Sequence, residues 1–160
     1  NARRCAKKGR YDDAVARLYR AAEAAAQLRL HQQYQLYRVG EGGQPIFSRL
    51  DPLKLPGAIR EAWQDRVSED GFLTLGLQDD YRLLEALGDP LAKRFAPLKG
   101  EKSLLTARNS SILAHGFEPV GEGVYHSLWN VIMELTGVSE EQLPRFPTLG
   151  CSPLENGAKG

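Results

Sequence analysis

Hydrophobic residues recur at helical spacing along most of this chain. The strongest example lies in residues 1–38, where only Gly9 and Arg10 interrupt the pattern. Apolar side chains return there every three or four positions, as expected for a helix with one buried face. The pattern predicts a helix, a turn and then a long helix, with Asp12 or Asp13 favourably placed in the first turn of the second one. The predicted buried stripe consists of Val15, Leu18, Ala22, Ala25 and Leu28.

Glycine and proline residues divide the rest of the chain into shorter elements. They are so frequent in residues 39–57 that we interpret this stretch as a long loop. Gly88 and Gly137 are positioned to end helices, and Asp89-Pro90 is positioned to begin one. No segment shows the alternation of polar and apolar residues that is typical of strands. Helices are predicted near residues 58–66, 77–87, 90–95 and 124–135, with a small capped turn at 139–142.

Together these elements predict an all-α protein, a bundle of about five to seven helices that begins with a long helix pair. Residues 1–143 form the predicted helical domain. Residues 144–160 are rich in proline and glycine and are predicted to be a tail with little regular structure. The chain starts at Asn1 and runs directly into helical sequence, which indicates a fragment of a longer protein.

The composition is that of an ordinary globular domain, and its charge is nearly balanced. Of the 160 residues, 42% are hydrophobic and 26% are charged, with a formal net charge of +1. No apolar run approaches the roughly 18 residues that cross a bilayer, and no leader sequence precedes a cleavage site. We therefore expect a cytoplasmic protein with no membrane partner. An RNA-binding surface would have to come from local basic clusters, because the net charge is too small to indicate one.

Neither metal nor cofactor binding is indicated by the residues that usually carry it. The histidines His31, His115 and His126 are scattered and lack paired acidic or thiol ligands. The sequence Gly121-Glu122-Gly123 follows no strand and lacks a third glycine, so it is not a nucleotide-binding loop. We therefore expect chemistry that needs no metal and no cofactor.

Residues 101–116 carry the most distinctive set of polar side chains. Arg108 and His115 lie seven positions apart, which on a helix is almost two full turns. Both side chains would face the same way, about 10 Å apart along the axis, with Ser111 between them on that face. Cleavage of RNA by its own 2′-hydroxyl needs a group that exchanges protons near neutral pH and a fixed cation for the phosphate. Histidine and arginine suit these two roles.

The spacing of these two residues also has an ordinary interpretation. An arginine on the surface and a histidine at a helix end, where the helix dipole favours it, occur together by chance in many proteins. The same holds for the nearby lysines, which can form a solvated face as readily as a phosphate-binding strip. Spacing alone therefore leaves both interpretations open.

Two segments resemble HEPN ribonucleases. Arg108-Asn109, followed by His115 on a helix late in an all-helical domain, resembles the R-x4–6-H signature of that family. The opening Gly9–Glu23, with the sequence GRYDDAVARLYRAAE, is similar to the first HEPN helix of one group. That group comprises CRISPR-associated proteins that join an N-terminal CARF sensor to a C-terminal HEPN effector. The resemblance covers roughly residues 1–137.

The resemblance implies a function and partners. HEPN ribonucleases usually act as homodimers in which two R-x4–6-H motifs meet in one composite site, and they cut single-stranded RNA without a metal ion. In relatives with a CARF domain, a cyclic oligoadenylate made by a type III CRISPR complex binds the sensor and activates the nuclease. A CARF domain is expected N-terminal to these 160 residues, which contain none that we recognise. The implied function is an antiviral endoribonuclease; the alternative is a non-catalytic helical dimerisation module.

Each candidate residue has a predicted role. The predicted catalytic set is His115 as general acid or base, Arg108 on the scissile phosphate, and Asn109 orienting one of them. Ser111 and Lys102 are the predicted substrate-binding residues. Elsewhere, Trp63 and Trp129 are candidates for stacking on bases, although burial is the better interpretation of Trp129. Asp79-Asp80 is interpreted as helix-start charge rather than as a catalytic pair.

Overall fold

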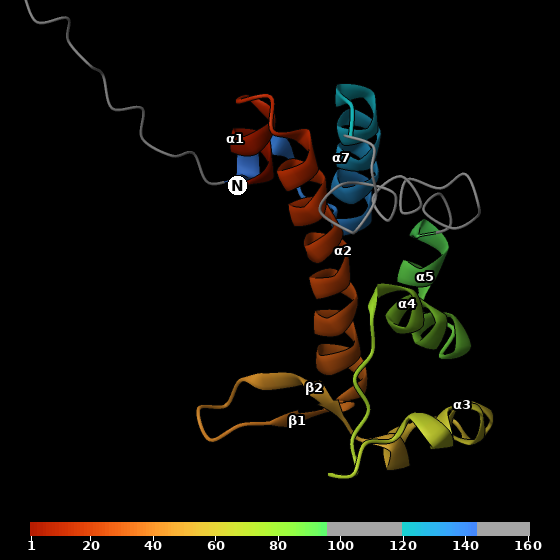
Figure 1. Cartoon of the computed structure of the whole chain (residues 1–160). Coiled ribbons are helices and arrows are strands. Elements are labelled where there is room, and N and C mark those ends of the chain that lie inside the picture. Colours follow the sequence, from red (N-terminus) through yellow and green to blue (C-terminus); the bar gives the residue numbers. More distant parts are fainter. Residues whose placement is uncertain (96–119, 144–160) are drawn as a thin grey trace, which may run out of the picture.

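The protein is mostly helical and is organised around one long helix. A computed structural model describes residues 1–95 and 120–143. Helix α2 (Tyr11–Tyr34) runs through the middle of the molecule, and the other described helices lie beside it or beyond its ends (Figure 1). The described part contains a single small sheet of two strands. The predicted all-α class and helical bundle are therefore confirmed.

The start of the chain folds as a short helix, a turn and a long helix, as predicted. Helix α1 (Ala2–Ala6) has 5 residues and α2 has 24, so the first member of the pair is short. Gly9 forms the turn with a φ of +70°, a left-handed conformation that glycine adopts without steric cost. Asp12 and Asp13 both lie in the first turn of α2, where the helix dipole favours negative charge.

The buried face of α2 differs from the predicted stripe in its second half. The side chain of Leu28 is exposed, with a relative accessibility of 44%, and Ala25 is only partly buried. Two successive steps of three residues move about 120° around a helix in one direction, whereas two steps of four move about 80° in the other. From Ala22 onward the buried face follows steps of four. Its hydrophobic members are Ala14, Val15, Leu18, Ala22, Ala26 and Leu30.

A β-hairpin follows α2, which makes the predicted loop at 39–57 wrong in its first half. The helix ends at Tyr34, and Gln35 takes a left-handed conformation with a φ of +52°. Strand β1 (Tyr37–Val39) then pairs antiparallel with β2 (Pro45–Leu50). The first strand has only 3 residues, too few to show an alternation of polar and apolar side chains.

The hairpin is tied to the segment that follows it. Leu50 and Leu73, both buried, exchange two backbone hydrogen bonds of 3.0 Å. The guanidinium groups of Arg38 and Arg49 each lie 5.6 Å from the centre of the Phe72 ring. These contacts fix the path of the chain at the lower end of α2 in Figure 1.

The remaining helices begin and end close to their predicted positions. Helix α3 (Gly57–Trp63) continues into a short 3-10 helix (Gln64–Arg66). Helix α4 (Leu77–Ala86) is followed by Gly88, whose φ of +71° ends it, and α5 (Pro90–Arg94) is capped by Asp89. Helix α7 (Glu122–Thr136) ends at Gly137 in a left-handed conformation. Ser139 and Gln142 form the predicted capping box.

Helix α7 packs on α2 through one apolar face. It lies beside the upper part of α2 in Figure 1. Helix α4 packs on α2 as well, and α5 bridges α4 and α7. This arrangement gives α2 neighbours on several sides. The buried residues of α7 are Tyr125, Leu128, Trp129, Ile132 and Leu135.

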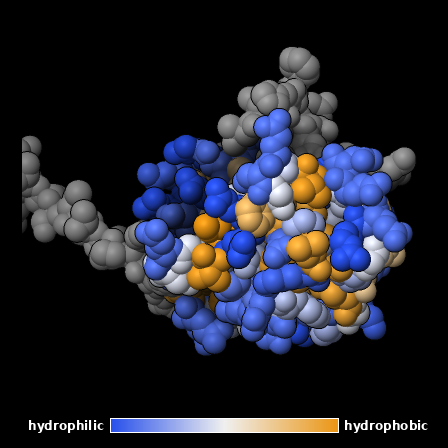
Figure 2. Space-filling model, turned by 90° about the horizontal axis from the view of Figure 1, so that it is seen from below, coloured by the Kyte–Doolittle hydropathy of each residue, from blue (hydrophilic) through white to orange (hydrophobic). Residues whose placement is uncertain are grey.

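The surface seen from the hairpin end is mixed in character. Hydrophobic residues there are interspersed among hydrophilic ones (Figure 2). None of the helices in the described ranges is long and apolar enough to cross a membrane.

Asp89 joins α5 to the C-terminal half of α2. It is buried, and its Oδ2 accepts hydrogen bonds from Arg29 Nε at 2.8 Å and from the Tyr34 hydroxyl at 3.0 Å. Its Oδ1 accepts one from the Leu91 N–H at 2.9 Å. Burial alone raises the pKa of this carboxyl, but the bonds from Leu91, Arg29 and Tyr34 outweigh it and hold the pKa below its ordinary value.

We predict that Asp89→Ala lowers the free energy of unfolding by about 2–4 kcal/mol at pH 7, because it removes a cap and leaves Arg29 without its buried partner. Urea denaturation measures the effect. Because the folded pKa of Asp89 is lowered, its contribution is present above the unfolded pKa and disappears as the pH falls through the folded pKa. The difference between wild type and variant should therefore shrink near pH 3.

A second capping aspartate provides a matched control. Asp51 accepts a bond from the Leu53 N–H at 3.0 Å in an exposed turn. Asp51→Ala should cost about 1 kcal/mol or less, since no charged partner is lost. Equal losses in the two variants would contradict the role assigned to the Arg29 and Tyr34 bonds.

Candidate functional site

The predicted catalytic and substrate-binding residues all lie outside the described part of the chain. Arg108, Asn109 and His115, together with Ser111 and Lys102, fall within residues 96–119. Their roles therefore remain predictions. The structure instead describes the residues that bound this segment on each side and the polar groups of the surrounding helices.

The segment begins after a tightly packed aromatic residue. Phe95, the last described residue before it, is buried and stacks on Tyr81 with ring centres 3.7 Å apart and planes 9° apart. Tyr81 in turn donates a hydrogen bond of 3.1 Å to the Ala22 carbonyl oxygen in the middle of α2. The position of Phe95 is thus fixed through α4 to the central helix.

The segment ends at a second contact with the same helix. Val120 is buried, and its N–H donates to Asp12 Oδ1 at 3.3 Å. Asp12 was expected to act only as a favourable charge in the first turn of α2, and the sequence carries no sign of this long-range bond. Asp12 and Ala22 are ten residues apart, so the two anchored levels are separated by about 15 Å along the axis of α2.

The described residues directly before Phe95 are basic and exposed. Lys93 and Arg94 form the last turn of α5, directly before Phe95, and both are exposed. Cations at this position stabilise the helix through its dipole. Cations on such an exposed turn also attract phosphate groups.

A second polar cluster lies between α2 and α4. Asp80 is fully buried, with a relative accessibility of 0%, and its Oδ1 accepts a hydrogen bond of 3.1 Å from the Tyr37 hydroxyl. Its Oδ2 has no hydrogen-bond partner within the described residues. Glu23 is also buried and pairs with Arg20. Asp80 does lie in the first turn of α4, as expected for helix-start charge, but nothing in the sequence marks it as buried.

This burial changes the protonation of Asp80. The pKa of its carboxyl is raised to about 7, chiefly by removal from water and also by the negative charges of Glu23 and Asp79, while the hydrogen bonds from Tyr37 and Gln27 oppose the change. The pKa of Tyr37 is also raised far above its ordinary value, chiefly by burial. A perturbed pKa is common at active sites. Asp80, however, has no solvent-accessible surface that a substrate could reach, so we interpret this cluster as structural.

The two tryptophans that were candidates for stacking on bases are both buried. Trp63 is buried, with the Arg66 guanidinium 5.1 Å from its ring centre, and Trp129 is buried in the face of α7. Neither presents a free ring on which a base could stack. No group of three or more metal-ligating side chains occurs within residues 1–95 and 120–143. His126, at the solvent-facing side of α7, lies 3.4 Å from Glu122.

Comparison with known proteins gives one match. The family model described as Csm6 HEPN domain matches residues 1–139, which include both the described bundle and residues 96–119. No curated protein and no solved structure matches the chain.

We predict that Asp80→Asn stabilises the protein at pH 8. The pKa of about 7, against an ordinary value of 3.8, makes the ionised carboxyl roughly 4 kcal/mol less favourable in the fold than in the unfolded chain. Because this folded pKa is raised, Asp80 lowers stability increasingly as the pH rises from about 4 to 7. Asparagine cannot ionise and still accepts the Tyr37 bond, so we expect a gain of about 1–3 kcal/mol at pH 8.

The measurement is thermal or urea denaturation of wild type and Asp80→Asn at pH 5 and pH 8. The gain should be larger at pH 8 than at pH 5, where Asp80 is protonated in the folded wild-type protein. Asp65→Asn serves as the control, because Asp65 is an exposed carboxylate and its substitution should give no pH-dependent gain. A constant difference between wild type and Asp80→Asn across this pH range would contradict the prediction.

Proposed function

Because this chain belongs to the Csm6 HEPN domain family of CRISPR-associated proteins, we propose that it is an endoribonuclease that cuts single-stranded RNA without a metal ion. In the proposed reaction, the 2′-oxygen of one nucleotide attacks the adjacent phosphorus of the same RNA chain. The bond from phosphorus to the 5′-oxygen of the next nucleotide breaks. One proton leaves the 2′-hydroxyl, and one is delivered to the departing 5′-oxygen.

In this proposal, Arg108 and His115 have different catalytic roles. The imidazole of His115 transfers a proton, since its ordinary pKa lies close to neutral pH. The guanidinium of Arg108 binds the phosphate and stabilises the charge that builds up in the transition state. Asn109 orients one of these groups, and Ser111 and Lys102 contact the RNA.

The structural observation that supports this proposal most directly is the fixed position of the two described residues that flank residues 96–119. Catalytic groups need a rigid support, because small displacements of a reacting group cost large factors in rate. Phe95 and Val120 provide such a support on both sides of the segment, one through the stack on Tyr81 and the other through the bond to Asp12. The matched family spans the same segment.

The proposal extends to assembly and control. Two copies of the chain would pair so that both R-x6-H motifs form one composite site. A CARF domain joined to the N-terminal side would bind a cyclic oligoadenylate and activate cleavage as part of type III CRISPR antiviral defence in the cytoplasm. In the rival hypothesis, the same domain only connects two copies and cuts nothing.

We predict that His115→Ala lowers the rate of single-stranded RNA cleavage by at least about 100-fold, the usual loss when a general acid or base is removed. The assay uses a fluorescently labelled RNA in the presence of EDTA, and chelation should leave the wild-type rate unchanged. Circular dichroism and the thermal midpoint should show that the variant is folded.

His126→Ala is the matched control, because His126 is an exposed histidine on a described helix, where it contacts Glu122 and the Tyr125 ring. It should cleave at the wild-type rate. Wild-type cleavage that survives in His115→Ala would end the assignment of this residue. A wild-type dimer with no detectable cleavage would favour the dimerisation module instead.

A further inference from the structure

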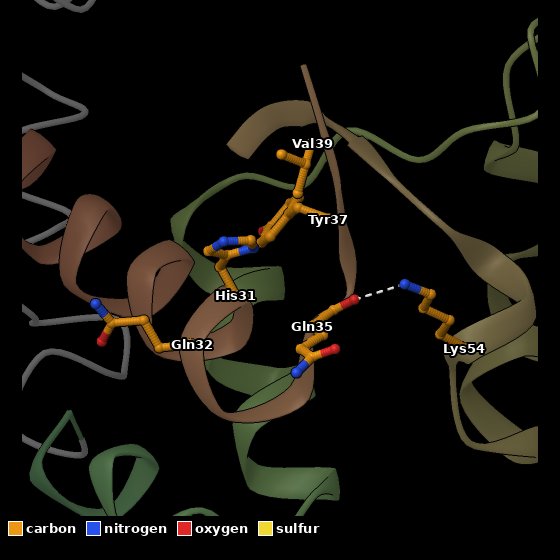
Figure 3. Close-up of a pocket in the computed structure, with 6 residues that line it drawn as sticks. All are labelled: His31, Gln32, Gln35, Tyr37, Val39 and Lys54. Carbon is orange, nitrogen blue, oxygen red and sulfur yellow. Dashed lines mark hydrogen bonds between the residues drawn. The ribbon is translucent and has the colours of Figure 1, made fainter. Parts of the chain in front are cut away.

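A pocket lies at the C-terminal end of α2, away from the anchors of residues 96–119. Its volume is about 360 Å³. The last turn of α2 forms one wall, β1 forms a second, and the 3-10 helix Pro52–Lys54 reaches it from a third side (Figure 3). The residues that line it are His31, Gln32, Gln35, Tyr37, Val39 and Lys54.

The lining combines flat or apolar surfaces with groups that form hydrogen bonds. His31 is partly exposed and Val39 is exposed, whereas Tyr37 is buried and forms the base of the pocket (Figure 3). Gln32 and Gln35 each offer a carboxamide that both donates and accepts, and glutamine can pair with two atoms of a base edge at once. No carboxylate is among the lining residues, and Lys54 gives the pocket a positive charge. A polar heteroaromatic ring carrying a negative group fits this combination.

His31 has a hydrogen-bonding atom that the protein leaves unused. Its Nδ1 is shielded from solvent and has no partner within the described residues. An unsatisfied nitrogen costs roughly 1–3 kcal/mol, so a partner from outside the protein has a clear energetic reason to bind. Rotation about the soft χ2 torsion of histidine brings a ring nitrogen towards the pocket.

Lys54 supplies the charge and is held in place. Its Nζ donates a hydrogen bond of 2.7 Å to the Gln35 carbonyl oxygen, at the end of α2 (Figure 3). An ammonium group has three donors, so two remain after this bond. The same bond offsets the partial negative charge of the helix end, which would otherwise repel a phosphate.

We propose that this pocket binds one unpaired nucleotide of the RNA substrate, with the base against His31 and within reach of Gln32 and Gln35, and a phosphate on Lys54. The proposal rests on the ribonuclease function proposed above and assigns that activity a second RNA contact. His31 lies 19 residues beyond Asp12 on α2, about 28 Å along the axis. Several nucleotides of a single strand span that distance, so one RNA chain can occupy the pocket and extend towards residues 96–119.

The first test measures binding of a short single-stranded RNA whose 2′-hydroxyls are methylated, so that the protein cannot cut it. His31→Phe keeps a planar ring and removes both nitrogens. We expect it to weaken binding at least about fivefold, the equivalent of one lost hydrogen bond, while the thermal midpoint stays the same or rises. Unchanged affinity in a folded His31→Phe protein would overturn the proposal.

Adjacent glutamines provide a matched pair on the same helix. Gln32 lines the pocket, whereas Gln33 is exposed beside it and does not. Alanine favours the helix at both positions, so neither change threatens the fold. Gln32→Ala should weaken RNA binding and Gln33→Ala should not. An equal effect of the two substitutions would overturn a base contact at Gln32.

Lys54→Gln, compared with Lys8→Gln in the exposed turn after α1, tests the phosphate contact. Lys54→Gln should weaken RNA binding more than Lys8→Gln does, and it should also make binding less dependent on salt. Free mononucleotides and inorganic phosphate are separate arms. Inorganic phosphate that competes as well as AMP would overturn the base contact, and a mononucleotide that binds without being displaced by the RNA would overturn the assignment to an RNA chain.

These binding measurements are independent of cleavage. If wild-type protein cuts RNA through His115 while the pocket variants bind it normally, the pocket proposal fails and the ribonuclease proposal stands. If the pocket variants lose binding but no His115-dependent cleavage occurs, the ribonuclease proposal fails and the nucleotide site remains.

Discussion

The structure depends on burial of one face of α2. In folded proteins most of the stability of a helix comes from the packing of its apolar face. Ala14, Ala22 and Ala26 are fully buried on that face. Their small side chains allow α4 and α7 to approach closely, and each of these helices adds large apolar residues in return. The two described residues that flank residues 96–119 are tied to this helix, Phe95 through Tyr81 and Val120 directly through Asp12.

Two buried aspartates show how the surroundings of a carboxyl group decide its effect. Asp89 accepts three hydrogen bonds, one of them from a guanidinium, and its pKa is lowered. Asp80 accepts hydrogen bonds from the neutral side chains of Tyr37 and Gln27 and lies near Glu23, and its pKa is raised. Burial disfavours the charged form of both, and only Asp89 has enough donors to reverse that effect. Asp89 therefore fastens α5 to α2, whereas Asp80 reduces stability near neutral pH.

Local signals explain which elements could be predicted from the sequence. Gly88, Gly137 and the Asp89-Pro90 pair act on the backbone within a few residues of themselves, and they placed helix ends correctly. The end of α2 was missed because Gln35, not a glycine, adopts the left-handed conformation there. The hairpin and the burial of Asp80 depend on partners distant in the sequence, which no local pattern encodes. The candidate catalytic residues were predicted from a motif and a family resemblance, and the described residues fix only the supports on either side of them.

The positions of the polar groups suggest a division of labour along α2. Phe95 and Val120, which flank residues 96–119, are held at two levels of the helix by an aromatic stack and by a bond from the Val120 N–H to the Asp12 carboxylate. The C-terminal end of α2, by contrast, has a pocket, an imidazole nitrogen with no partner among the described residues, and a lysine with donors to spare. A nuclease needs rigidity where bonds break, but it can hold the rest of a flexible strand through weaker contacts elsewhere. One rigid helix can meet both needs, since it fixes the distance between them.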